Sequence, residues 1–228
     1  MSRLILIPTP IGNLEDITYR AVRLLGEVDL VLAEDTRNTL KLLSHFNISK
    51  PIWSYHQHNE HQTTAKIVEE ISAGKTIALV SDAGTPGISD PGYLLLRACL
   101  DAGIEIETLP GPTALIPAVV NSGLPCDRFV FEGFLPHKKG RQTRLAQLKS
   151  NRYTFVLYES PHRLLKTLTQ LVDLFGPEHL ASVSRELSKI HEETVRGSLQ
   201  ELVNYYQTNT LKGEFVIVCG ASSATEHI

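Results

Sequence analysis

The stretch Thr76-Ile77-Ala78-Leu79-Val80-Ser81-Asp82-Ala83-Gly84-Thr85-Pro86-Gly87 decides the fold. Its first half is a β-branched, apolar run typical of a buried strand, and its second half is a turn of small residues with one carboxylate. In an open α/β sheet, ligands bind beyond the carboxyl ends of the strands, and glycines let the backbone approach a ligand closely. The stretch therefore predicts a strand that ends in a ligand-binding loop, with a plain strand-to-helix connection as the alternative.

Two more strands end in loops of the same kind. Residues 4–7 run into Pro8–Asn13, and residues 105–109 run into Pro110–Ala114. A further strand is expected at 29–33, and helices are expected near 17–26, 36–46, 62–73, 91–102 and 112–122. The fourth of these helices has Asp90 as its expected N-cap and Pro91 at its first position. Alternating strands and helices predict a parallel sheet, and the turn-rich segment after Gly123 places a domain boundary there, so that the first domain is 1–123.

The second half, residues 124–228, has a different pattern. Strands are expected at 129–131, 153–158, 180–184 and 215–219, and a polar helix near 198–206. A leucine-rich helix is expected from Ser160, as cap, to the Gly176-Pro177 stop. This order predicts an α+β domain with a mixed or antiparallel sheet.

Composition places the chain among ordinary globular proteins. It has 228 residues, 42% hydrophobic and 21% charged, with a formal net charge of −3. No apolar run approaches the roughly 20 residues that span a bilayer, so a cytoplasmic location is expected. Cys99, Cys126 and Cys219 are odd in number and far apart, which favours reduced thiols over a disulfide framework.

A basic segment stands out in the second half. Residues 133–158 contain no acidic residue and carry Lys138, Lys139, Arg141, Arg144, Lys149 and Arg152. Such a segment is able to meet a polyanion, although a solvated basic helix face explains the charge pattern equally well.

Several common catalytic signatures are absent from the sequence. It contains no G-x-G-x-x-G after its first strand, no G-x-x-x-x-G-K-[ST], no G-x-S-x-G, no H-E-x-x-H and no C-x-x-C. The usual phosphate cradles and the hydrolases that use these motifs are therefore disfavoured. What remains is a set of strand-end loops whose carbonyls, amides and hydroxyls suit a polar ligand of moderate size. Among them, Asp82 suits a ribose hydroxyl or an amino group.

Six blocks, taken in order, resemble the tetrapyrrole-methylase-like superfamily, and within it a branch that methylates ribosomal RNA. The blocks are residues 7–14, 33–37, 81–86, 109–114, 158–163 and 212–215. The resemblance covers nearly the whole chain. It implies a two-domain α/β fold, with a mainly parallel N-terminal sheet, a mixed C-terminal sheet and a cofactor cleft between the domains.

The resemblance also implies the activity and its ligands. It implies an S-adenosylmethionine-dependent homodimer that methylates the 2′-oxygen of a cytidine in the decoding region of 16S rRNA. No metal is chemically required for such a transfer. The implied cofactor contacts are Pro10, Asp82, Gly84, Thr85, Thr113, Ala114, Leu157 or Tyr158, Lys212, Gly213 and Glu214.

A ribose hydroxyl is a poor nucleophile, so a general base is expected. Glu34 and Asp35 follow the second strand, and Asp35 is the preferred base, with Arg37 orienting it. The alternative is that this block only caps a helix. Asn13, Glu159 and Arg163 are further polar groups expected near the cleft. The expected RNA contacts are Lys138, Lys139, Arg141, Arg144 and Arg163.

Two other clusters remain open at this point. His56, His58 and His61 lack a standard zinc spacing, so a polar loop before a helix is favoured over a metal site. Residues 184–193 either contact RNA or form a solvated turn. Two alternative functions also remain: a methyltransferase for a small molecule such as a tetrapyrrole, and a non-catalytic RNA-binding or cofactor-sensing module.

Overall fold

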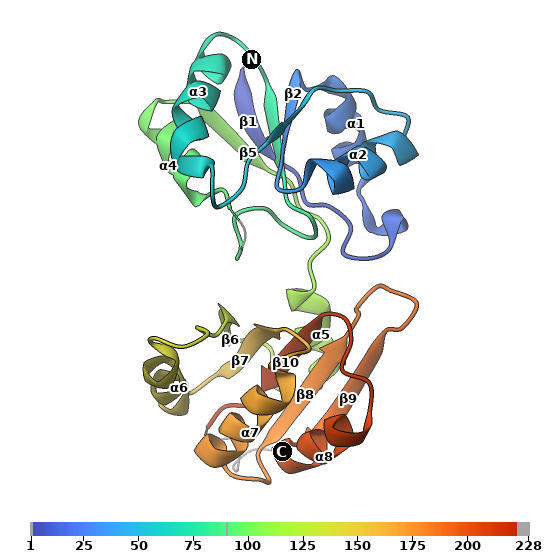
Figure 1. Ribbon diagram of the computed structural model, residues 1–228, viewed down its shortest axis with the longest axis vertical. Coiled ribbons are helices and arrows are strands. Elements are labelled where there is room, and N and C mark those ends of the chain that lie inside the picture. Colours follow the sequence, from blue (N-terminus) through green and yellow to red (C-terminus); the bar gives the residue numbers. More distant parts are fainter. Residues whose placement is uncertain (1, 90, 223–228) are drawn as a thin grey trace. The chain divides into compact units, whose positions relative to one another are not determined.

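The computed structural model describes residues 2–89 and 91–222, which form two compact units (Figure 1). The first unit ends at Thr113 and the second begins at Ala114. The predicted first domain extended to residue 123 and so included the helix that follows Ala114. That helix packs on three strands of the second unit, which is why it belongs there.

The first unit alternates strands and helices throughout. Its elements are β1 (Arg3–Leu6), the short 3-10 helix η1 (Leu14–Asp16), α1 (Tyr19–Glu27), β2 (Leu30–Ala33), α2 (Thr36–His45), β3 (Ile52–Ser54), α3 (Glu60–Ser72), β4 (Ile77–Val80), α4 (Tyr93–Asp101) and β5 (Glu105–Thr108).

All five strands of the first sheet are parallel, in the order β3-β2-β4-β1-β5. Helices α1 and α2 cover one face and α3 and α4 the other, as Figure 1 shows. Strands β2 and β4 are buried on both faces, which explains why they read as continuous apolar runs. Because the strands are parallel, their carboxyl ends meet at a single edge of the sheet.

The second unit begins with a helix and then adds a mixed sheet. Its elements are α5 (Leu115–Ser122), β6 (Phe129–Phe134), α6 (Arg141–Lys149), β7 (Thr154–Glu159), α7 (Leu164–Phe175), β8 (Leu180–Arg185), β9 (Glu193–Ser198), α8 (Leu199–Thr208) and β10 (Phe215–Cys219). The strand order is β6-β7-β10-β8-β9, with β6 and β7 parallel and the other pairs antiparallel.

One large core holds the second unit together. Side chains of α6, α7 and α8 pack against one face of its sheet, around Leu157, Leu168 and Ile217. Helix α5 packs on β8, β9 and β10 and contributes nothing to that core. The parallel first sheet and the mixed second sheet confirm the predicted fold class.

Several elements differ from the sequence-based expectation. Strands β3 and β9 were not predicted, because both are partly exposed edge strands without an apolar run. Helix α4 begins at Tyr93 after Gly92, rather than at Pro91, and Asp90 lies outside the described residues. Helix α7 begins at Leu164, after a turn that contains Ser160 and Pro161.

Two further findings concern membrane-spanning helices and the cysteines. Within residues 2–89 and 91–222, no helix is both long enough and apolar enough to cross a membrane. All three cysteines are free thiols, with Cys99 and Cys219 buried and Cys126 exposed.

Replacing a core leucine of α7 should destabilise the second unit strongly. Leu168 is 0% exposed within its core, whereas Leu180 of the same unit is 46% exposed. We expect Leu168→Ala to lower the free energy of unfolding by about 2–5 kcal/mol and Leu180→Ala by about 0.5 kcal/mol or less, in urea unfolding followed by circular dichroism. Equal losses in the two variants would contradict the assigned core.

Candidate functional site

The loops after β1 and β4 are joined by a pair of backbone hydrogen bonds. The amide of Thr9 donates to the carbonyl of Gly84, and the amide of Gly84 donates to the carbonyl of Thr9, both at 2.9 Å. The Thr9 hydroxyl donates to the Ser81 carbonyl at 2.9 Å, and the Ser81 hydroxyl donates to the Gly84 carbonyl at 3.2 Å. Gly84 has a φ of 83°, which favours glycine. Its amide and carbonyl therefore join the two loops, and its amide is not left for a ligand.

Asp82 connects the end of β4 to the start of α2. One carboxylate oxygen accepts the Asp35 amide at 3.1 Å, and the other accepts the Asn38 side-chain amide at 3.1 Å. The residue is exposed, and each carboxylate oxygen has a second lone pair. These two bonds fix the direction of the carboxylate while leaving it able to accept a hydroxyl or amino donor.

A cavity of about 180 Å³ lies beside these loops. It is lined by the loops after β1 and β4, by η1 and by α2. The lining residues are Thr9, Pro10, Leu14, Asn38, Thr39, Lys41, Leu42, Ser81 and Asp82. Sites for whole small ligands measure roughly 300–1,000 Å³, so this cavity suits one part of a ligand, of the size of a ribose. Pro10 and Asp82, two of the predicted cofactor contacts, therefore line the same cavity.

Four other predicted residues of this region lie outside the lining of the cavity. Thr85 is half-buried in the loop after β4, and Thr113 and Ala114 stand on either side of the division between the units. Asn13 accepts the Glu15 amide and caps η1. Thr9 and Asn38 were not predicted, because only the folded sheet brings them to Ser81 and Asp82.

Asp35 is fully engaged as the cap of α2. Its carboxylate accepts the Arg37 amide at 2.8 Å and the Arg37 guanidinium at 3.0 and 2.6 Å. Hydrogen bonds from Arg37 lower the pKa of Asp35 to about 2. A carboxylate with so low a pKa is a weak base at neutral pH. These contacts are those of a helix cap, which was the alternative interpretation of residues 34–37.

The pKa of Glu34 is shifted in the opposite direction from the pKa of Asp35. Burial raises the pKa of the Glu34 carboxyl, and the negative charge of Asp82 raises it further, while a hydrogen bond from the Asp82 backbone opposes them. Of the two carboxyls, the one whose pKa is raised is the better proton acceptor.

The two residues predicted on β7 face opposite sides of the second sheet. Leu157 is buried in the core of the second unit, so its side chain is not available to a ligand. Tyr158 is half-buried and contacts Phe131 and Phe134 edge to face. Of the pair, only Tyr158 presents a side chain outside the core.

The loop Lys212-Gly213-Glu214 is held by a segment whose role the sequence left open. The Glu186 carboxylate accepts the Glu214 amide at 2.9 Å, and the Glu186 amide donates to the Glu214 carbonyl at 2.9 Å. Lys189 donates to Glu186 at 2.8 Å and to Glu214 at 3.1 Å. A Cβ on Gly213 would overlap the Glu186 carboxyl. Glu186 therefore shapes this loop; its sequence signal is the Glu-x-x-Lys spacing to Lys189.

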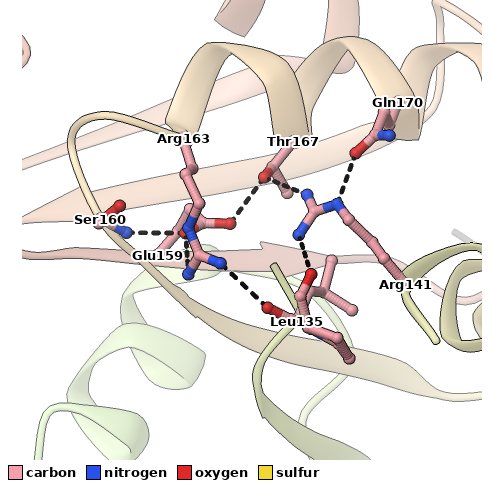
Figure 2. Close-up of polar contacts among 8 residues, drawn as sticks. Leu135, Arg141, Glu159, Ser160, Arg163, Thr167 and Gln170 are labelled. Atoms are coloured by element: carbon pink, nitrogen blue, oxygen red, sulfur yellow. Dashed lines mark hydrogen bonds and ion pairs between the residues drawn. The ribbon is translucent and has the colours of Figure 1, made fainter. Parts of the chain in front are cut away.

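A buried ion-pair network occupies the region where Arg141 and Arg163 were expected to contact RNA (Figure 2). The Glu159 side chain is 0% exposed; it pairs with Arg163 at 2.7 Å and accepts the Thr167 hydroxyl at 2.6 Å. Arg141, 4% exposed, donates to Thr167 at 2.7 Å and to Gln170 at 2.9 Å. Both arginines therefore have internal partners, and Arg141 is buried while the Arg163 side chain is 16% exposed.

The network also fixes the chain that follows β6. Arg163 donates to the Leu135 carbonyl at 3.1 Å, and Arg141 donates to the Pro136 carbonyl at 3.2 Å. Lys138 and Lys139 come next and are exposed, as their predicted role requires. Arg144 is exposed but pairs with Glu132 and Gln147. Of the expected RNA contacts, Lys138, Lys139 and Arg144 are therefore exposed, and Arg144 is held by Glu132 and Gln147.

The histidine cluster forms a polar loop before α3. The His56 amide donates to the Asn59 side chain at 2.8 Å, and the His58 amide donates to the His56 ring at 3.2 Å. The Asn59 side chain donates in turn to the Ser54 carbonyl at 3.0 Å. Over residues 2–89 and 91–222, no group of three or more His, Cys, Asp or Glu side chains is arranged to hold a metal ion.

The chain matches a known protein family and is similar to named relatives. Residues 3–203 match the family described as "Tetrapyrrole (Corrin/Porphyrin) Methylases". The chain is 54% identical to "Ribosomal RNA small subunit methyltransferase I" of Synechocystis sp., over 98% of this chain and 80% of that protein. It is 45% identical to the protein of the same name from Thermotoga maritima, over 96% of this chain and 98% of that one.

Solved structures share the fold at low sequence identity. A uroporphyrin-III C-methyltransferase from Thermus thermophilus, complexed with S-adenosyl homocysteine, matches with a TM-score of 0.65 and 20% identity, over 98% of this chain and 100% of that one. A diphthine synthase matches with a TM-score of 0.73 and 14% identity, over 96% of this chain and 90% of that one.

Removing the Arg37 side chain should return Asp35 to ordinary behaviour. In Arg37→Ala, we expect the pKa of Asp35 to rise from about 2 toward roughly 3.9, measured by carboxyl NMR titration. Since the folded-state pKa is lowered, the stabilisation from this pair is present above roughly pH 4 and is lost as the pH falls toward 2. Arg20→Ala, at an exposed arginine of α1, is the control; an unchanged Asp35 pKa in Arg37→Ala would refute the assigned cause.

Proposed function

The chain belongs to the tetrapyrrole methylase family and, within it, to the ribosomal RNA small subunit methyltransferase I family, and on that premise we propose that it transfers a methyl group from S-adenosylmethionine to small-subunit ribosomal RNA. The acceptor is the 2′-oxygen of a cytidine in the decoding region of 16S rRNA. The observation that carries the proposal is the cavity at the joined ends of β1 and β4, which suits one part of a ligand, in a chain so similar to these relatives.

The hydrogen-bond acceptors at this cavity fit the proposed cofactor. Asp82 is held by two hydrogen bonds in a direction that suits ribose hydroxyls, and Pro10 and Thr9 supply apolar contact and carbonyl oxygen. When bound, S-adenosylmethionine supplies an electron-poor methyl group on a positive sulfur. Carbonyl and carboxylate oxygens at strand ends suit that charge better than the amide nests that hold phosphates. All the cofactor contacts remain predictions: Pro10, Asp82, Gly84, Thr85, Thr113, Ala114, Leu157 or Tyr158, Lys212, Gly213 and Glu214.

Methyl transfer requires the protein's own residues to align the reacting atoms and to accept a proton. The first is alignment, because a displacement needs the 2′-oxygen in line with the methyl group at near-attack distance. The second is removal of the proton from the 2′-hydroxyl, which is otherwise a poor nucleophile near pH 7.

We assign proton acceptance to Glu34 in place of the preferred Asp35. Three hydrogen bonds from Arg37 and a pKa of about 2 make Asp35 a poor acceptor. Glu34 lies next to it, directly after β2, and burial raises the pKa of its carboxyl. Asp35 and Arg37 then have a positioning role, since together they cap α2 and orient the Asp35 amide toward Asp82.

The proposed oligomeric state rests on the family resemblance, and the proposed location rests on where the RNA substrate is found. We propose a homodimer, as is usual in the superfamily, and a cytoplasmic location, where ribosomal RNA is found. The small-molecule alternative is disfavoured because the structurally similar uroporphyrin enzyme is only 20% identical to this chain, whereas the ribosomal RNA enzymes reach 54%. A non-catalytic RNA-binding or cofactor-sensing module is distinguished by the methyl-transfer assay, because such a module binds its ligand and transfers no methyl group.

The proposed activity should appear as methyl transfer to small ribosomal subunits. Incubation with labelled S-adenosylmethionine, nuclease digestion and mass spectrometry should locate one 2′-O-methylated cytidine in 16S rRNA. Large subunits serve as the control and should accept no label. Cofactor binding without transfer to any rRNA would refute the catalytic proposal, and label on a base rather than a ribose would refute the assigned acceptor.

Substitution of the two neighbouring acids should separate their roles. Glu34→Gln keeps the shape of the side chain but removes the base, so we expect single-turnover methylation to fall about 10²- to 10⁴-fold. Asp35→Asn keeps a good helix cap, so the fall should be less than about tenfold. The wild-type rate should also rise with pH through the raised pKa of Glu34, and this rise should be missing in Glu34→Gln.

Equal cofactor affinity and thermal midpoint in both variants are the control for folding. A large loss in Asp35→Asn together with near-normal transfer by Glu34→Gln would reverse the assignment.

A further inference from the structure

Three aromatic rings gather at the outer strand of the second sheet. The Phe131 and Tyr158 ring centroids are 5.0 Å apart, and those of Phe134 and Tyr158 are 5.7 Å apart. Phe131 and Tyr158 are half-buried, whereas Phe134 is 53% exposed. We call these three residues the aromatic cluster. Because Leu157 points into the core, its neighbour Tyr158 and the rest of the cluster lie on the opposite face of the sheet.

A β-bulge creates this cluster. Phe131 pairs with Val156, Gly133 with Leu157 and Phe134 with Tyr158, so that Glu132 is an extra residue on β6. In a regular strand, residues three apart point to opposite faces, and Phe131 and Phe134 would be separated. The bulge, with Gly133 at a φ of 69°, turns Phe134 to the face that Phe131 already occupies. Bulges of this kind commonly re-aim side chains at functional sites.

The chain directly after Phe134 is both fixed and positive. Arg163 holds the Leu135 carbonyl, as Figure 2 shows, and Arg141 holds the Pro136 carbonyl. Lys138 and Lys139 follow as exposed cations. The one acid on β6, Glu132, is paired with Arg144. An exposed ring therefore precedes exposed positive charge by a few residues, on a segment whose carbonyls are held by Arg141 and Arg163.

We propose that the aromatic cluster, led by Phe134, stacks an unpaired nucleobase of the RNA substrate, with Lys138 and Lys139 on the adjacent phosphates. Single-stranded nucleic acid is held in this way, by aromatic stacking combined with cations along the backbone. The positive flank favours RNA over a second copy of this chain, since an apolar contact between copies gains nothing from two lysines. The choice of ribosomal RNA as the ligand rests on the proposed function.

Binding of a short single-stranded oligoribonucleotide that carries 2-aminopurine tests the proposal, because stacking quenches the fluorescence of this base. Phe134→Leu keeps an apolar side chain but removes the ring, so we expect affinity to fall about fivefold or more and quenching to be lost. Phe134→Trp should keep both. Tyr19→Ala, which removes an exposed ring of the first unit, is the matched control and should bind as the wild type does.

The salt dependence separates stacking from phosphate contact. Phe134→Leu should lower the affinity at every salt concentration and leave the slope of log affinity against log salt unchanged. Reversal of both lysines, Lys138→Glu with Lys139→Glu, should reduce that slope by about 1.4, which corresponds to two lost phosphate contacts on a single strand.

Three results would overturn the proposal. Unchanged oligonucleotide binding by Phe134→Leu removes the stacking role. Weaker S-adenosylmethionine binding with RNA affinity intact assigns the cluster to the cofactor, and a changed oligomeric state with RNA affinity intact assigns it to a second copy. Methyl transfer by the wild type is measured separately: ring-dependent RNA binding without transfer leaves this proposal standing and refutes the proposed function alone.

Discussion

The parallel pairing of β1 with β4 is the constraint on which the candidate site depends. Because the two strands run side by side in the same direction, their loops leave the sheet at the same edge, and Thr9 and Gly84 join them with two backbone hydrogen bonds. Asp82 then reaches from β4 to α2 and orients the residues that follow β2. The cavity, the engaged Asp35 and the partly buried Glu34 all follow from this arrangement.

Charge burial has the corresponding role in the second unit. The Glu159 carboxylate is removed from water, and it remains acceptable there because Arg163, Thr167 and the Ser160 amide all bind it. Arg141 extends the network to the chain after β6. The same arginines that looked on sequence like RNA contacts therefore serve to hold the segment that displays Lys138 and Lys139.

The fold could be predicted from periodicity wherever burial was uniform. The continuous apolar runs of β2 and β4 and the amphipathic α7 were recognisable, because a strand covered on both faces or a helix with one apolar face leaves a clear pattern. Strands β3 and β9 left none, because edge strands bury little and tolerate polar residues. The predicted boundary at residue 123 differs from the division after Thr113 because α5 packs on strands that come much later in the chain, and sequence order alone carries no sign of that contact.

For this protein, the sequence by itself determined the class of fold, the strand-end loops that include Pro10 and Asp82, and the family, since each of these is written in local patterns and ordered blocks. Only the tertiary structure decided which charged groups are available. Asp35 and Glu34 are neighbours with the same chemistry, yet Arg37 lowers the pKa of one and burial raises the pKa of the other. Arg141 and Lys139 are likewise alike in charge, but packing buries the first and exposes the second. Availability depends on neighbours that the fold brings together from distant parts of the chain.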